Sequence, residues 1–213
     1  MRNKASGTDN QQGSLRTTRL GDPSETTRRP PTHNEIRAYI QGAAHDGTFN
    51  RYNQRVRIAQ KGTAWLRILQ KLLQRIGCTS WVYREGKDRD VFVLETQAKF
   101  VDFMFDPQRL NTRSERVAYI RGFFDAEGGI PRSKYSRFYI QLVQNNKRKL
   151  IVIKKLLDQL HIKTGVIHNP SKRVDPDYWR MFVRAESWKV FVQTIGSWHP
   201  RKYKILQARW KMI

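Results

Sequence analysis

Cysteine is nearly absent from this chain of 213 residues. The single cysteine, Cys78, cannot form an internal disulfide, and we expect it to be a small buried hydrophobe. The sequence has no apolar run of eighteen residues and so no candidate membrane span. The N-terminus has no apolar core of a secretory signal peptide. These absences favour the cell interior, a prokaryotic cytoplasm or an organelle, over secretion.

Acidic residues are also scarce. The sequence has 18 Asp and Glu against 41 Lys and Arg, which gives a formal net charge of +23. Such an excess implies a polyanionic partner, and nucleic acid is the first candidate. An acidic membrane surface is the alternative, but no basic amphipathic helix with an aromatic face supports it. No zinc-ligand or helix-turn-helix pattern is present either.

The most informative segment is AYIRGFFDAEGG, residues 118–129. It predicts an apolar helix with Gly122 at its centre that ends on Asp125, Glu127 and two glycines. Carboxylates at the partly negative C-terminal end of a helix lose stability unless a cation offsets their charge. Oxygen-only ligands with open positions suit Mg²⁺. The segment therefore predicts a cation site at the end of a helix.

A second copy of this segment, AYIQGAAHDGTF, spans residues 38–49. Asp46 and Glu127 lie 81 positions apart (127 − 46), and Gln60 and Asn145, which precede the next apolar helix of each copy, lie 85 apart (145 − 60). The chain therefore contains an internal duplication. Aligning Gly42 with Gly122 leaves Asp46 one residue short of Glu127, whereas aligning the acids puts Gly42 opposite Phe123.

With IRGFFDAEG in place of the namesake motif, the chain resembles the two-repeat LAGLIDADG homing endonucleases from about residue 34 to the C-terminus. The resemblance implies an α+β fold of two pseudo-symmetric αββαββα repeats. Their antiparallel sheets would form a DNA-binding saddle, with the motif helices packed at the interface. We expect a polar N-terminal arm (1–33), the first repeat (34–107), a linker (108–116) and the second repeat (117–213).

Residue patterns predict the elements of each repeat. Strands are expected over 51–60, 80–84 and 90–95 in the first repeat and over 137–144, 165–167 and 178–184 in the second. Helices are expected over 97–105 and 187–195. The linker should lead directly into the second motif helix.

Strand alternation predicts the nucleic-acid surface. In 137–144 the apolar side chains face one side, while Arg137, Tyr139 and Gln141 face the other. The odd positions of 51–57 likewise share a face, which carries no acid. Arg, Asn and Gln can pair with guanine or adenine edges in the major groove. The predicted DNA-binding residues are Arg51, Asn53, Arg55, Arg57, Arg84, Arg137, Tyr139, Gln141, Arg180 and Arg184.

The motif helices are expected to carry the chemistry. Gly42 and Gly122 would let the two helices approach closely and bring Asp46 and Glu127 together. Neighbouring carboxylates repel each other, so without metal one of them should have a raised pKa. The resemblance implies that Asp46 and Glu127 bind Mg²⁺, with Mn²⁺ or Ca²⁺ able to replace it for binding. Such ions can activate water and stabilise the leaving oxygen of a phosphodiester.

The resemblance also implies supporting residues. Gln60 and Asn145 stand where the family places polar groups around the attacking water. A basic residue near the scissile phosphate is expected at Lys202 in the second repeat and at Arg109 or Arg113 in the first. Asp125 is expected to act at the helix end rather than as the main metal ligand.

These residues predict a monomeric, Mg²⁺-dependent endonuclease that cuts double-stranded DNA within a long target, asymmetric because the two halves of the chain differ. Two alternatives remain open. The first is a maturase that binds intron RNA and helps it fold, and the second is a catalytically inactive DNA-binding protein. The retained pair of acids favours cleavage, because binding alone gains nothing from like charges at the helix ends.

Overall fold

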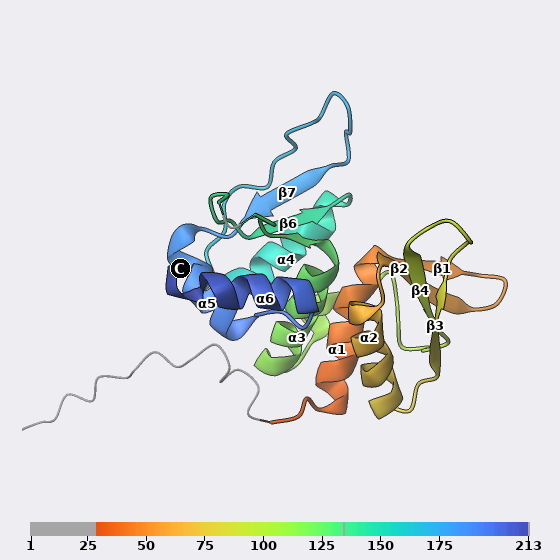
Figure 1. Ribbon diagram of the computed structural model, residues 1–213. Coiled ribbons are helices and arrows are strands. Elements are labelled where there is room, and N and C mark those ends of the chain that lie inside the picture. The colour runs from red at the N-terminus through yellow and green to blue at the C-terminus, as the bar shows by residue number, and fades with distance from the viewer. Residues whose placement is uncertain (1–28, 134, 213) are drawn as a thin grey trace, which may run out of the picture.

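Two halves of mixed helix and sheet meet at a central pair of helices, α1 (His33–Ala43) and α3 (Arg113–Glu127) (Figure 1). The computed structural model describes residues 29–133 and 135–212, so most of the arm expected over 1–33 lies outside the described residues. The α+β class with antiparallel sheets, predicted from the sequence, is confirmed. No helix in this described part is long and apolar enough to span a membrane.

Both central helices begin with the same device. The hydroxyl of Thr32 accepts from the Glu35 amide and the Glu35 carboxylate accepts from the Thr32 amide; Thr112 and Glu115 repeat this capping box at the start of α3. The two boxes lie 80 positions apart (112 − 32). A capping box satisfies two amides that have no partner within the helix. It therefore fixes the start of α3 at Arg113, inside the segment expected to be linker.

The first half is a four-stranded antiparallel sheet with α2 (Ala64–Arg75) against one face. Its strands are β1 (Gly47–Asn50), β2 (Arg55–Lys61), β3 (Ser80–Arg84) and β4 (Val91–Thr96), in the order β1-β2-β4-β3. The strand expected over 51–60 begins four residues later than predicted. Residues 51–54 form the turn that joins β1 to β2, where the Asn50 side chain accepts from the Tyr52 amide. Such local bonding favours a turn over a strand.

The prediction of a helix over 97–105 was wrong, because this segment forms turns. Thr96 Oγ1 accepts from the Ala98 amide, and the Gln41 side chain of α1 bonds both the amide and the carbonyl of Asp102. These contacts satisfy the backbone against α1 without a helix. A 3-10 turn, η3 (Pro107–Arg109), then leads towards α3.

The second half contains a shorter sheet, with strands β5 (Gly128–Gly129), β6 (Gln141–Gln144) and β7 (Trp179–Phe182) in that order. Residues 137–140 were predicted as strand but precede β6, whose partner β5 is only two residues long. The strand expected over 165–167 is absent; isolated bridges pair Thr164 with Val183 and His168 with Arg180. The remaining elements are α4 (Lys147–Gln159), η4 (Ala185–Ser187), α5 (Trp188–Thr194), α6 (Pro200–Arg209) and η5 (Trp210–Met212).

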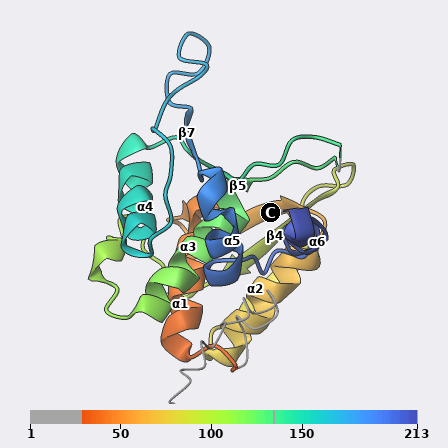
Figure 2. The same ribbon diagram turned by 90° about the vertical axis from the view of Figure 1, so that its left-hand side faces the viewer.

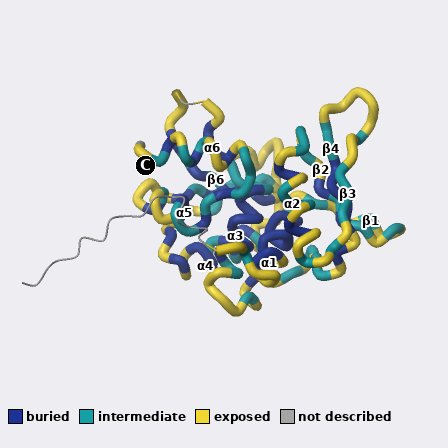
Figure 3. The backbone as a smooth tube through the Cα atoms, turned by 60° about the horizontal axis from the view of Figure 1, so that its bottom comes forward, coloured by how far each residue is buried: buried dark blue, intermediate teal, exposed yellow. Residues whose placement is uncertain are grey.

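The core follows the central helices. Most residues of α1 and α3 are buried (Figure 3), and Tyr39, Tyr119, Phe123 and Phe124 are among the largest fully buried side chains. Figure 2 shows α1 and α3 next to each other, and in Figure 1 they lie between the two halves. The C-terminal ends of both helices thus meet where the two sheets join. There α1 is followed by η2 (Ala44–Asp46) and then β1, and α3 is followed directly by β5.

Candidate active site

Two glycines set the distance between α1 and α3. A Cβ atom added to Gly42 would lie 2.1 Å from the Tyr119 carbonyl oxygen, and one added to Gly122 would lie 2.0 Å from the Tyr39 carbonyl oxygen. Both distances are far below van der Waals contact, so only glycine permits this approach at either position. The contacts are reciprocal at a spacing of 80 (122 − 42 and 119 − 39). The glycine alignment of the two motifs therefore describes the helix interface.

The first motif has one residue fewer than the second between its glycine and its acid. A change of helix type compensates for this difference. After Ala43, the chain reaches Asp46 through three residues of the 3-10 helix η2, whereas α3 continues as an α-helix for four residues from Phe123 to Glu127. A 3-10 helix rises about 2.0 Å per residue and an α-helix about 1.5 Å. Three steps of one and four of the other both rise about 6 Å. Asp46 and Glu127 thus end at similar heights along the paired helices.

The two acids face one cavity of ≈ 400 Å³, which Gln144 and Asn145 also line. Gln60 Nε2 donates to Asp46 Oδ2 over 2.8 Å, and Gln144 Nε2 donates to Glu127 Oε1 over 3.4 Å. Each acid thus has a glutamine from the second strand after its helix, β2 for Asp46 and β6 for Glu127. In the second repeat this glutamine is Gln144, one position before the Asn145 chosen from the sequence. Strand alternation is the signal that identifies it, because Leu142 and Gln144 share the buried side of β6.

Both carboxyls have a raised pKa. Burial raises the pKa of Glu127 to about 7, and the negative charge of Asp46 adds to this effect, while Lys202 and Gln144 oppose it. Burial also raises the pKa of Asp46, against the hydrogen bond from Gln60 and the charge of Lys202. A site that disfavours its own charged form gains most from a bound cation.

Lys202 lies beneath this site and not on its surface. Its side chain comes from α6, is 2% exposed, and donates to the carbonyl oxygens of Phe124 and, over 2.9 Å, Asp125 in the last turn of α3. Burial lowers its pKa to about 8, while the carboxylates of Asp125, Glu127 and Asp46 act in the opposite direction. Lys202 is therefore the cation that the acidic end of α3 requires. The contact with a scissile phosphate expected from the sequence would need this buried amine to become exposed.

Asp125 holds the segment that carries Lys202. Its carboxylate accepts from the Tyr39 hydroxyl (2.7 Å), the Ser197 hydroxyl and the backbone amides of Trp198 (2.8 Å) and His199 (3.1 Å). His199 is the N-cap of α6. Asp125 therefore acts at the start of α6 and across the helix interface, rather than as a cap of its own helix or as a wall of the acidic cavity.

The basic residues expected in the first repeat lie elsewhere. Arg109 lines a separate cavity of ≈ 260 Å³ with Asn34 and Arg37 from the first half of α1. Arg113 is the first residue of α3. Both therefore stand near the N-terminal ends of the motif helices, away from the ends that carry Asp46 and Glu127.

The sheet surface of the first half differs from its prediction in one respect. Arg55 and Arg57 do alternate with the buried Val56 and Ile58 on β2. This outward side also carries an acid, however, because Glu95 of β4 is paired with Arg57 in the sheet register. Glu95 lies 3.1 Å from both arginines. The expectation of a face without acids was wrong, because the sequence does not show which strand pairs with β2.

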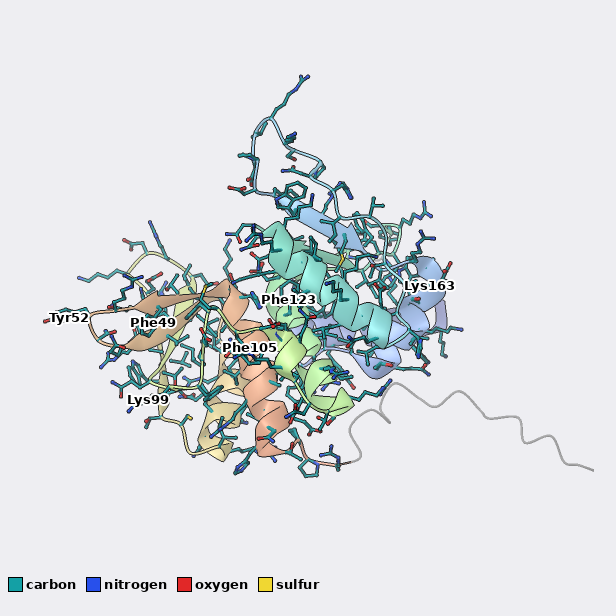
Figure 4. The ribbon with its side chains drawn as sticks, turned by 180° about the vertical axis from the view of Figure 1, so that it is seen from behind. Phe49, Tyr52, Lys99, Phe105, Phe123 and Lys163 are labelled. Atoms are coloured by element: carbon teal, nitrogen blue, oxygen red, sulfur yellow. The ribbon has the colours of Figure 1, made fainter. Side chains whose placement is uncertain are left out.

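The other predicted DNA-binding residues occupy varied positions. Arg51 and Asn53 lie in the β1–β2 turn, beside Tyr52, which projects from its tip and is 99% exposed (Figure 4). Arg84 shares its side of the sheet with Val82, opposite to Arg55 and Arg57. In the second half, the exposed residues are Arg137 and Arg184, and the half-buried residues are Tyr139, Gln141 and Arg180.

Comparison with known proteins places these features in context. A family model described as a LAGLIDADG-like domain matches residues 34–104 and 114–196. The structure of I-DmoI in complex with DNA and Mn is similar at 21% identity and a TM-score of 0.60, over 78% of this chain and 98% of that chain. The structure of I-DmoI in complex with DNA and Ca is similar at 20% identity and a TM-score of 0.63, over 84% of this chain and 100% of that chain. Among curated proteins, none matches the sequence.

A structure with a different name is equally similar. The N-terminal LAGLIDADG domain of DUF199/WhiA has 14% identity and a TM-score of 0.62, over 84% of this chain and 91% of that chain. At these identities the likeness concerns the fold. Since the similar structures include both a homing endonuclease and a WhiA domain, an activity has to be argued from the site.

Proposed function

Because the chain belongs to the LAGLIDADG family, we propose that it is a divalent-metal-dependent endonuclease that cuts double-stranded DNA as a monomer. The observation that carries this proposal is the pair of carboxylates, Asp46 and Glu127, which face one cavity at the ends of two crossing helices. Their pKa values are raised, so the folded protein bears a cost for their charge. A bound cation would offset that cost.

The residues present fit a divalent ion that is shared with substrate. The described residues contain no cluster of three or more His, Cys, Asp or Glu side chains suited to a metal. Mg²⁺ is commonly held by one or two carboxylates together with water and substrate phosphates. Asp46 and Glu127 would supply the carboxylates, and DNA would supply the phosphate oxygens. Such an ion lowers the pKa of bound water and stabilises the charge on the leaving oxygen.

The chain's own residues would hold and orient this site. Gln60 and Gln144 each fix one carboxylate through a side-chain amide, and Asn145 lines the same cavity. Lys202 places a buried positive charge below both acids. Gly42 and Gly122 keep the two helix ends at a distance that lets one substrate meet both acids. Each half of the chain would contribute one acid, and each acid would serve the cleavage of one DNA strand.

The two sheets would hold the DNA. The outward side of the first sheet carries Arg55 and Arg57, and that of the second carries Gln141 and Arg180. These side chains can read base edges in the major groove. The net charge of +23 supplies the long-range attraction to phosphate. Since the residues of the two surfaces differ, the proposed target is asymmetric.

Selection of cleaved sites from a randomised plasmid library tests this proposal. The reactions contain Mg²⁺ and the full chain, with EDTA as one control and Glu127→Gln as the other. The expected result is a single long, asymmetric site that is cut by the wild type only and only with metal. No cut site together with tight binding of structured intron RNA would favour the maturase alternative, and sequence-specific DNA binding without cleavage would favour an inactive DNA-binding protein.

A further inference from the structure

Glu95 is an acid in the middle of a surface that otherwise suits DNA. It belongs to β4, and its register places it beside Arg57 on the side of the sheet that faces away from α2. The residue is only 6% exposed. A carboxylate at this place weakens the attraction of the surface to phosphate. Its presence on this side therefore has to be explained by what it does to its neighbours.

The contacts of Glu95 are specific and shared between two arginines. Arg55 Nη1 donates to Glu95 Oε2 over 3.1 Å, and Arg57 Nε lies 3.1 Å from Glu95 Oε1. The hydroxyl of Tyr83 on β3 donates to Oε1 over 2.8 Å. One buried carboxylate thus ties residues of three neighbouring strands together. Both of its oxygens are engaged, so the carboxylate itself is fixed.

The outer parts of the two arginines are held as well. The guanidinium of Arg55 lies over the Trp81 ring, 4.5 Å from its centroid. Arg57 Nη2 donates to Glu85 Oε1 over 2.8 Å and contacts the Tyr83 hydroxyl at 3.4 Å. The two side chains nevertheless remain about one-third exposed, at 34% and 32%. They are therefore oriented and still accessible to a ligand.

Arg180 on the second sheet has different partners. Arg180 Nε contacts His168 Nε2 at 3.2 Å, and its guanidinium lies 5.3 Å from the centroid of Phe182. Its described partners are an imidazole and a ring, neither of which is an acid. A buried acid that holds arginines, Glu95, is thus described in the first sheet and not beside Arg180. It contributes to the difference between the two surfaces.

We propose that Glu95 is a positioning residue for DNA recognition: it orients Arg55 and Arg57 on the outward side of the first sheet and so sets the base preference of one half of the target. This inference rests on the proposed DNA-binding function. An arginine fork discriminates among bases only when its direction is fixed, because the paired hydrogen bonds to guanine are directional. The Glu95 charge also weakens the general affinity for DNA, because it repels the phosphates.

Binding of a randomised duplex library in Ca²⁺, followed by sequencing of the bound fraction, tests the proposal without requiring cleavage. The variants are Glu95→Gln, which keeps the shape but removes the charge, and Glu85→Gln as its matched control. Within the described residues the Glu85 carboxylate pairs with Arg57 and not with Arg55, and its side chain is 40% exposed. A second assay measures the Kd for an unrelated duplex over a range of salt concentrations.

Glu95→Gln should lower the base preference in one half-site by about fivefold or more. It should also tighten binding to the unrelated duplex by about two- to fivefold. Glu85→Gln should tighten this general binding to a similar degree but lower the base preference less, because Arg55 and Arg57 keep their contacts with Glu95. A Glu95→Gln variant that keeps the wild-type preference overturns the proposal.

Tyr83→Phe provides the second line of evidence in case Glu95→Gln does not fold. It removes only the hydroxyl, which donates to Glu95 over 2.8 Å and accepts from Arg57 over 3.4 Å, so the same half-site should lose preference to a smaller extent. An unchanged preference in this folded variant overturns the proposal as well. If the wild type itself selects no sequence, the proposed DNA-binding function fails and the inference with it, and this result is distinct from a defect confined to the variants.

Discussion

The hydroxyl of Tyr39 donates a hydrogen bond of 2.7 Å to Asp125, across the interface between α1 and α3. Its counterpart is the contact of 2.7 Å between the Tyr119 hydroxyl and His45 Nε2, again 80 positions along the chain (119 − 39 and 125 − 45). Burial lowers the pKa of His45 to about 3, so this imidazole is neutral near pH 7. One interface position has thus diverged into an acid in one repeat and a neutral ring in the other.

Gly122→Ala should destabilise the fold and abolish cleavage. The added Cβ would meet the Tyr39 carbonyl oxygen at 2.0 Å, and the two backbones must separate to relieve this contact. We expect a loss of about 3 kcal/mol or more in the free energy of unfolding, measured by urea denaturation. Gly165→Ala is the control, because its Cβ would have its nearest contact at 3.7 Å. Equal stability of the two variants would contradict the account of the helix crossing.

Glu127→Gln should abolish cleavage of the selected target while DNA binding in Ca²⁺ survives. The amide keeps the size of the side chain but removes the charge proposed to hold the metal. Plasmid cleavage and a gel-shift assay measure the two effects separately. Loss of both binding and cleavage would instead make Glu127 a structural residue.

The metal-free protein should lose stability as the pH rises from about 4.5 to about 7. The pKa of Glu127 is 4.5 when unfolded and about 7 when folded, so the folded state binds the proton more tightly in this window. Stability is therefore greatest below the unfolded pKa and falls through the folded pKa, by at most about 3 kcal/mol. Urea unfolding in EDTA at pH 5 and pH 8 measures the difference.

The matching control for this pH effect is Glu127→Gln, which has no carboxyl to titrate at this position. Its stability should change less between pH 5 and pH 8 than that of the wild type, and at pH 8 it should be the more stable of the two. Identical pH profiles would show that Glu127 titrates normally.

Lys202→Met should destabilise the protein by about 3 to 5 kcal/mol, because the change leaves the buried carbonyl oxygens of Phe124 and Asp125 without their donor and removes a positive charge that favours the buried Asp125 carboxylate. Lys204→Met is the control: it removes a lysine two positions further along α6 that is exposed. Thermal unfolding compares the two variants. If both behave alike, the buried amine of Lys202 contributes nothing specific to the end of α3.

Gln144→Ala should impair cleavage more than Asn145→Ala. Gln144 donates to Glu127, and loss of a side chain that orients a metal ligand typically costs about 10- to 100-fold in activity or metal affinity. Cleavage rates at limiting and saturating Mg²⁺ measure the effect, which excess metal should partly restore. A larger defect in Asn145→Ala would support the assignment made from the sequence.

The sequence predicts the central part of this fold well, because its signals are local. The repeated glycine motif gives the helix pair, and the acids that follow it mark the cavity. The capping boxes at Thr32 and Thr112 are equally local signals, which would have placed the start of α3 at Arg113. These features depend on residues close together in the chain.

Features that depend on pairing between distant segments could not be predicted in the same way. The burial of Lys202 results from the docking of α6 on the end of α3, and the ion pairs of Glu95 result from the pairing of β4 with β2. In both cases the sequence gives the charge or polarity of a residue but not its partner. The choice of Gln144 over Asn145, by contrast, follows from the alternation along β6, in which Leu142 and Gln144 share the buried side.

A crystal structure of the protein with its selected DNA and Mn²⁺, with the metal located by anomalous scattering, tests the central claim most directly. The account predicts Mn²⁺ bound by the carboxylates of Asp46 and Glu127 and by oxygens of the DNA phosphates between them. Bound DNA with no metal at these two acids, or with the metal held by other residues, would contradict it.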